Sequence, residues 1–169
     1  MPSPNNLTIK RYLPQRALPP YAFVPGKHPH PEKEGGHMQD EEVIVEPLNQ
    51  DNYDSNEGYL YGLDLFNNGY YWESHVWWEA LWNEAGRKGE MADFLKGLIK
   101  LGAGGVKLAL SQESISQGHI DRALELLIPI SKKHQQYCGI DLIKLIESCK
   151  SLNVENPFQN LKLTLEDFN

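Results

Sequence analysis

Nine of the eleven prolines in this 169-residue chain lie within its first 47 positions. A proline inside a helix removes a backbone hydrogen-bond donor and clashes with the preceding turn, so this segment cannot form a long helix. Apolar side chains nevertheless recur in it, at Tyr12, Leu13, Leu18, Tyr21, Phe23 and Val24. We therefore expect residues 1–50 to form an extended arm packed on the rest of the chain, with a short strand at residues 42–46. A disordered tail is the alternative.

From about residue 54 onward, apolar residues recur every three to four positions, which is the spacing of amphipathic helices. Glycine-containing turns divide this region into five predicted helices, at residues 56–67, 70–84, 91–110, 116–131 and 140–151. Pro129 is expected to kink or split the fourth helix. The third helix contains Gly97, Gly102, Gly104 and Gly105, which we attribute to the close approach of a neighbouring helix.

The predicted fold class is therefore all-α, a compact bundle of about five helices with an extended proline-rich N-terminal arm. The arm spans residues 1–50, the helical domain residues 51–155 and a C-terminal tail residues 156–169. Short connections between the helices favour antiparallel neighbours.

Charge and hydropathy narrow the classes of partner. The formal net charge is −7, which argues against nucleic acid as the main partner. No stretch reaches the roughly 18 consecutive apolar residues of a membrane helix, and the first twelve residues lack a signal-peptide core, so we expect a soluble cytoplasmic protein without membrane contact.

The two cysteines, Cys138 and Cys149, are expected to be reduced and partly buried. The partner stays unknown, and a homo-oligomer is left open.

The second predicted helix carries the strongest chemical signal. All four tryptophans, Trp72, Trp77, Trp78 and Trp82, lie in it, interleaved with Glu73, His75 and Glu79. His75 and Glu79 are about 40° apart on one face, and such a pair can offer a nitrogen and an oxygen to one Zn²⁺ ion. Glu73 lies about 200° from His75, so it needs a different partner.

Two ligands do not complete a zinc site, and a third would have to come from the arm, which offers His28, His30 and His37. The alternative is that His75 and Glu79 form a buried hydrogen-bonded pair among tryptophans that fill the core. For the arm histidines the alternative is a proline-stiffened turn with solvated or stacked rings. The chain has no phosphate-binding Gly-Lys-Ser/Thr loop, no Gly-x-Ser-x-Gly elbow and no Cys-x-x-Cys pair, so nucleotide and acyl-transfer chemistries are not indicated.

Three runs carry a family resemblance. They are residues 65–75 (LFNNGYYWESH), residues 78–82 (WEALW) and residues 94–101 (FLKGLIKL). Over about residues 57–130 the chain resembles domain-of-unknown-function family 309, and its arm is similar to the N-terminal extension of one branch of that family. The resemblance implies a small all-helical protein, and the family has carried the label of predicted metal-dependent hydrolase. The family commonly has an acidic residue after the histidine, where this chain has Val76.

Carried over to this chain, the family pattern points to Glu73, His75, Glu79 and Trp82, and to His30 and His37 in the arm. The preferred interpretation is an uncharacterised helical domain that acts as a non-catalytic binding or structural module, with a buried His/Glu/Trp polar stripe and a pocket formed by Trp72, Trp78 and Trp82. The alternative is a metal-dependent hydrolase. In this hydrolase, His75 and Glu79, with His30 or His37, bind a divalent metal such as zinc, and the catalytic residue Glu73 or a second arm histidine acts on the bound water. A small-ligand pocket without a metal is the remaining possibility.

Overall fold

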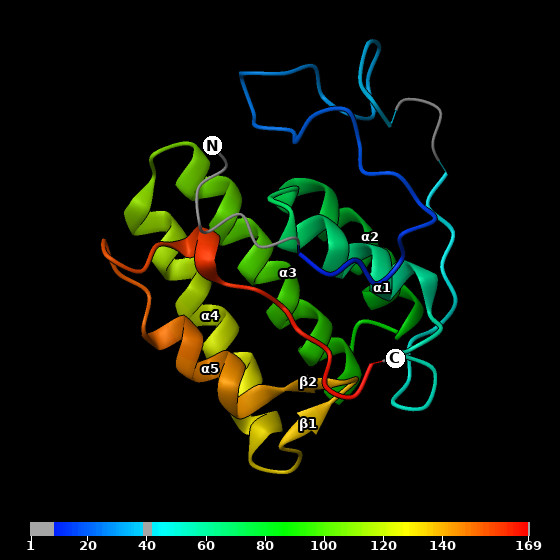
Figure 1. Ribbon diagram of the computed structural model, residues 1–169, viewed down its shortest axis with the longest axis vertical. Helices are drawn as coiled ribbons and strands as arrows, with labels where there is room; N and C mark the ends of the chain where they lie inside the picture. The colour runs from blue at the N-terminus through cyan, green and yellow to red at the C-terminus, as the bar shows by residue number, and fades with distance from the viewer. Residues whose placement is uncertain (1–8, 39–41, 169) are drawn as a thin grey trace.

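The computed structural model of the protein describes residues 9–38 and 42–168. Five α-helices account for the body of the chain: α1 (Glu57–Asn67), α2 (Tyr71–Glu84), α3 (Glu90–Ala109), α4 (Glu113–Ser131) and α5 (Leu142–Lys150). A short 3₁₀ helix, η1 (Phe158–Asn160), and a two-stranded sheet of β1 (Gln136–Tyr137) and β2 (Ile140–Asp141) complete the regular structure of the described residues (Figure 1). The prediction of an all-α bundle of about five helices is confirmed.

Helices that follow one another in the sequence pack side by side, with α3 between α2 and α4. The glycines of α3 allow this close packing. A Cβ atom added to Gly97 would lie 2.8 Å from Cδ2 of Leu127 on α4, and one added to Gly105 would overlap the ring of Tyr71 on α2. The predicted explanation for these glycines, the close approach of neighbouring helices, is confirmed.

Local capping sets the helix ends. The side chain of Asn56 accepts a hydrogen bond from the backbone N–H of Tyr59 at 3.0 Å and so begins α1. Gly69, with a φ of 87°, forms the tight turn between α1 and α2. Asp141 accepts from the backbone N–H of Lys144 at 3.0 Å and begins α5.

One local prediction was wrong, and another was wrong in part. Residues 42–46 form no strand, because Val43 and Val45 pack individually on the core and the Glu46 carbonyl accepts a hydrogen bond from Asn56 at 3.0 Å. The small sheet lies instead at residues 136–141, and Ile140 forms an additional isolated bridge with Leu165. α4 is not split at Pro129 but continues to Ser131, because the proline falls in the last turn of the helix.

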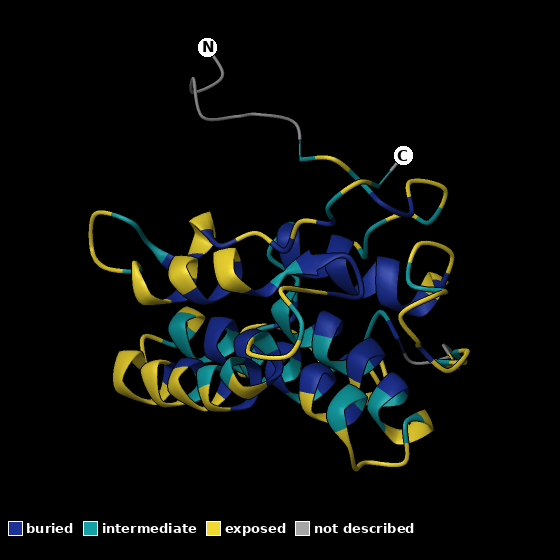
Figure 2. Ribbon diagram, turned by 90° about the horizontal axis from the view of Figure 1, so that it is seen from below, coloured by how far each residue is buried: buried dark blue, intermediate teal, exposed yellow. Residues whose placement is uncertain are grey.

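The core runs through all five helices and also takes in side chains from the arm and the tail, such as Tyr12, Leu48 and Leu163. Figure 2 shows buried positions facing the interior and exposed positions on the outward turns of the helices and loops.

Both cysteines are free and buried, although Cys138 lies in the turn between the strands and only Cys149 lies on a helix. In the described part of the chain, no helix combines the length and apolarity needed to cross a membrane.

The C-terminal tail is fixed to α1 by one side chain. Asn67 donates from Nδ2 to the carbonyl of Leu163 at 2.9 Å and accepts from the N–H of the same residue at 2.7 Å. The backbone N–H of Leu165 in turn donates to the hydroxyl of Tyr12 in the arm at 2.9 Å. Polar side chains of α1 and of the arm thus satisfy backbone groups of a tail segment without regular structure.

Candidate functional site

Glu73, near the start of α2, is a buried carboxylate that contacts the arm at two points. Its side chain is only 1% exposed. Oε2 accepts a hydrogen bond from the backbone N–H of Phe23 at 2.9 Å and lies 2.8 Å from Nε2 of His37, whose ring is 3% exposed. Hydrogen bonds to a buried carboxylate are among the stronger ones in proteins. Glu73 thereby fixes both ends of the arm segment between these two residues.

The second polar atom of each side chain in this contact has no hydrogen-bond partner. Glu73 Oε1 and His37 Nδ1 are both buried, and neither forms a hydrogen bond within the described residues. A buried polar atom without a partner costs free energy, so the pair retains unused hydrogen-bonding capacity. The indole Nε1 of Trp78, which packs against Gly62, is also buried without a hydrogen-bond partner among the described residues.

Asp64 on α1 is a second buried carboxylate that holds the arm, and the sequence analysis missed it. Its side chain is fully buried and accepts from the backbone N–H groups of Tyr12 at 2.7 Å and Leu13 at 2.8 Å. The Arg11 guanidinium lies 2.8 Å from the same carboxylate. The available signal was a lone acidic residue within the apolar run of residues 59–66, where a charge must find a partner if the helix is buried on all sides.

His75 and Glu79 lie one turn apart on α2, but they are not an enclosed pair. His75 Nε2 is 3.6 Å from Glu79 Oε2, and the side chains are 29% and 55% exposed. Nδ1 of His75 lies 2.6 Å from the Trp72 carbonyl, which fixes the orientation of the ring. The expectation that this polar stripe is buried is therefore wrong for Glu79, because α2 turns this face toward the surface next to the arm.

Next to this face lies a hollow of about 490 Å³, which we call the arm–α2 hollow. It is lined by side chains from α2 and from the arm: Glu32, Glu42, Val43, Trp72, His75, Val76, Glu79, Ala80 and Asn83. Its walls thus combine three carboxylates, one imidazole and one indole. Three of the residues singled out from the sequence, Trp72, His75 and Glu79, line it, whereas Glu73 does not.

The four tryptophans have different environments. Trp78 is fully buried in the core against Phe66, and Trp77 is buried against Tyr61 with the Arg16 guanidinium over its ring. Trp72 lines the arm–α2 hollow and contacts the rings of Phe23 and His30 in the arm. Trp82 is partly exposed, with the cationic ends of Arg87 and Lys96 over its ring. Of the predicted pocket residues, only Trp72 lines this hollow.

The arm histidines are also dispersed. His37 contacts Glu73, while His30 packs against Trp72 and accepts a hydrogen bond at Nδ1 from the Glu32 backbone at 3.2 Å. His28 stacks on Tyr21 with ring centroids 4.8 Å apart. Within residues 9–38 and 42–168, no group of three or more His, Cys, Asp or Glu side chains is arranged to hold a metal ion. The predicted ligands are instead separated: His37 pairs with the predicted catalytic residue Glu73, His75 faces Glu79, and His30 packs on Trp72.

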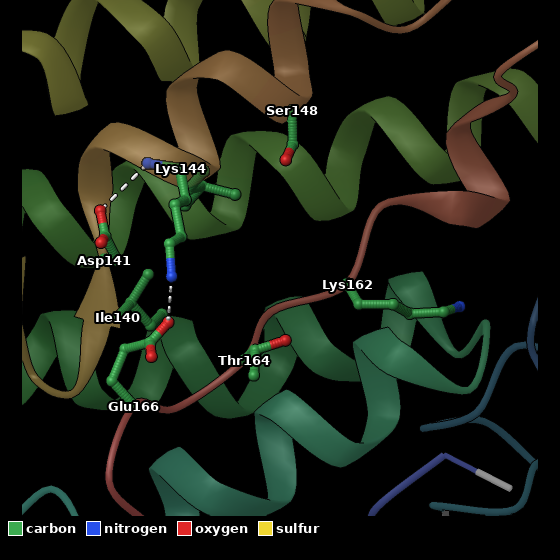
Figure 3. A pocket seen from close by; sticks show the side chains of 8 residues that line it. Ile140, Asp141, Lys144, Ser148, Lys162, Thr164 and Glu166 are labelled. Carbon is green, nitrogen blue, oxygen red and sulfur yellow. Dashed lines mark hydrogen bonds and ion pairs between the residues drawn. The ribbon is translucent and has the colours of Figure 1, made fainter. Parts of the chain in front are cut away.

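A second hollow, of about 250 Å³, lies between β2, α5 and the tail. Figure 3 shows Lys144 extending toward Glu166, and the two groups are 3.5 Å apart. Lys162 points away from this pair (Figure 3), and its ammonium donates to the carbonyls of Asn67 and Gln159 at 3.0 and 2.8 Å. Burial lowers the pKa of Lys162. Both cations already have partners, so this hollow offers no free charge to a ligand.

The protein is thus a small helical protein. Polar side chains of its first two helices hold an arm and a tail that are themselves not α-helical. The model of one protein family, described as Domain of unknown function (DUF309), matches residues 59–118. This match supports the family assignment that the resemblance in the sequence implied, over residues 59–118 of the chain. Among curated proteins, no match to the chain was found.

The matched segment runs from α1 to the beginning of α4 and contains both Asp64 and Glu73. Their hydrogen-bond partners in the arm, such as Tyr12 and His37, precede the segment. The matched segment thus supplies buried acceptors, and the preceding arm supplies the donors.

Proposed function

We propose that this protein is a non-catalytic binding or structural module, in which the helical domain holds the arm in place and the two together present the arm–α2 hollow to a ligand or partner. The observation that carries the proposal is the position of Glu73. A carboxylate that is 1% exposed and shared between Phe23 and His37 supports the fold of the arm. A general base must instead reach the group from which it removes a proton.

The arrangement of the predicted metal ligands supports the same proposal. His37 pairs with Glu73, and His75 faces Glu79 at a surface-exposed position, so the ligands required by a hydrolase do not converge on one point. The hollow is concave and combines an indole with several polar groups, which is typical of binding sites for small ligands or side chains. We therefore assign Trp72, His75 and Glu79 to binding, and Glu73 and His37 to positioning of the arm.

The proposal is tested by purifying the protein without a metal-affinity tag and measuring its metal content. We expect less than about one metal ion for every ten chains, and no increase in melting temperature when Zn²⁺ is added, since a ligand that binds the folded state raises stability. A stoichiometric metal that is lost in the variants His75→Ala and Glu79→Gln would overturn the proposal.

A second measurement tests the binding surface directly. Small fragments are screened by following the indole N–H resonances of the four tryptophans, and we expect hits that shift Trp72 and lose binding in Trp72→Ala. Trp82→Ala is the matched control, because Trp82 does not line the hollow. Hits that disappear equally in both variants, or a screen without any shift of Trp72, would contradict the assignment of this hollow.

A further inference from the structure

α3 carries a row of lysines on its outer face. Lys96, Lys100 and Lys107 are separated by four and seven positions, so at about 100° per residue they lie within about 40° of one another. With a rise of about 1.5 Å per residue, the row is about 16 Å long. We call these three residues the lysine face. None of them lines the arm–α2 hollow.

The lysine face has no carboxylate partner within the described part of the chain. The ion pairs there involve Arg11, Arg122, Lys144 and the histidines at positions 37, 75 and 134, and none involves a residue of the lysine face. Lys96 lies over the ring of Trp82, 5.3 Å from its centroid, and Arg87 lies over the same ring. A basic row without an ion-paired carboxylate among the described residues is unexpected in a chain with a net charge of −7.

A neighbouring histidine responds to these charges. His119 on α4 is partly buried, and its pKa is lowered by burial and by the positive charges of Lys100 and Lys107. The lysines are thus close enough to repel the protonated imidazole. An anion bound at this position would reduce that repulsion.

An apolar side chain lies next to the same region. Ile115 is 50% exposed and is one turn before His119, so both lie within about 40° of each other on α4. Ala103 lies between Lys100 and Lys107 on α3, and its small side chain leaves room for the close approach of another helix. Positive charge in a line, beside one exposed apolar side chain, is complementary to an amphipathic helix with acidic residues.

We propose that the lysine face, together with His119 and Ile115, is a docking surface for an acidic amphipathic helix of a partner protein. Carboxylates spaced at four and seven residues along such a helix would match the three lysines, and an apolar residue beside them would contact Ile115. The observations favour this partner over nucleic acid, because a phosphate backbone offers no apolar group to the exposed Ile115 beside the lysines. A single flanking isoleucine is too little apolar surface for binding to a membrane.

The test uses an acetylated and amidated alanine-based helical peptide, labelled for fluorescence anisotropy, with glutamates at the matching spacing and a leucine beside them. The triple variant Lys96→Gln, Lys100→Gln, Lys107→Gln should weaken its binding by about tenfold, the sum of three modest ion pairs. The control variant Lys27→Gln, Lys133→Gln, Lys150→Gln changes the net charge equally at exposed positions elsewhere. It should bind within about twofold of the parent.

Three further readouts make the result specific. The pKa of His119, followed by NMR, should rise when the peptide is added, and Ile115→Ala should weaken binding. A peptide of the same composition with the glutamates on different helix faces should bind less tightly. The triple lysine-to-arginine variant keeps the charge and should retain binding, which separates loss of charge from loss of fold.

Several outcomes would overturn the proposal. Equal weakening in the control variant would show that only net charge matters, and equal binding of the rearranged peptide would remove the helical match. An unchanged pKa of His119 in the peptide complex would place the peptide elsewhere. Tighter binding of an RNA oligonucleotide or of phosphatidylserine vesicles through the same lysines would assign the surface to a different class of partner.

Discussion

His37 Nε2 lies 2.8 Å from Glu73 Oε2, with both side chains almost completely buried, although the two residues are 36 positions apart. The same oxygen accepts the backbone N–H of Phe23. One carboxylate of α2 therefore determines the path of the arm segment whose residues help to line the arm–α2 hollow.

Removing the charge of Glu73 should destabilise the protein. We expect Glu73→Gln to lower the free energy of unfolding in urea by about 2 kcal/mol, because two hydrogen bonds to a buried charged group are weakened. Glu84→Gln changes an exposed position of the same helix and should stay within about 0.5 kcal/mol of the parent. A double-mutant cycle with His37→Ala should give a coupling of about 1 kcal/mol or more. Additive effects would show that the contact contributes nothing.

Asp64 is expected to be at least as important for the arm. Asp64→Asn weakens the contacts of a fully buried carboxylate to two backbone N–H groups and to the partly buried Arg11, and should cost about 3 kcal/mol. It should also accelerate cleavage by trypsin after the exposed Lys27. Asp93→Asn, at an exposed position of α3, is the control. Unchanged cleavage in Asp64→Asn would mean that the arm is held by other contacts.

His75 and Glu79 should be nearly independent of each other in stability. His75 Nε2 and Glu79 Oε2 are 3.6 Å apart at a partly exposed position, where solvent screens their interaction. A double-mutant cycle of His75→Ala and Glu79→Gln, measured by urea unfolding, should therefore give a coupling below about 0.5 kcal/mol. A coupling above about 1 kcal/mol would imply a buried pair and contradict the observed exposure.

Two glycines should respond to alanine in opposite directions. Gly105→Ala places a methyl group in the ring of Tyr71 and should cost about 1 to 3 kcal/mol, as overpacking in a close helix contact does. Gly118→Ala meets nothing within 4 Å on the exposed side of α4, and should stabilise the protein by up to about 1 kcal/mol through helix propensity. Thermal unfolding of the two variants tests the packing of α3 against α2. If both variants were stabilised, that packing would be wrong.

Stability should fall at alkaline pH. Burial raises the pKa of Cys149 from 9.0 to about 12, and burial also raises that of Tyr71 from 10.0 to about 12. Between pH 9 and pH 12 the unfolded chain therefore binds fewer protons than the folded one, so the free energy of unfolding decreases as pH rises, by up to about 1.4 kcal/mol per pH unit for each group. Urea unfolding between pH 8 and pH 11 measures this slope, and Cys149→Ala should make it shallower. An identical slope in the variant would remove Cys149 as a cause.

The sequence by itself determined the helices, their order and the need for close packing at the glycines of α3. It also indicated that Glu73 cannot share a partner with His75, because the helical repeat places them on opposite sides of α2. These inferences depend only on residues within one helix or turn, where geometry follows directly from the spacing along the chain.

The tertiary structure alone decided which group meets Glu73, that Asp64 also binds the arm, and that Glu79 faces solvent. Helical spacing gives the angle between two side chains, but it does not specify what covers that side of the helix. The partners of Glu73 and Asp64 are backbone N–H groups and a histidine from a segment without regular periodicity, about 50 positions away in the case of Phe23 and Tyr12. Only the path of the arm over the helices brings those donors to the buried carboxylates.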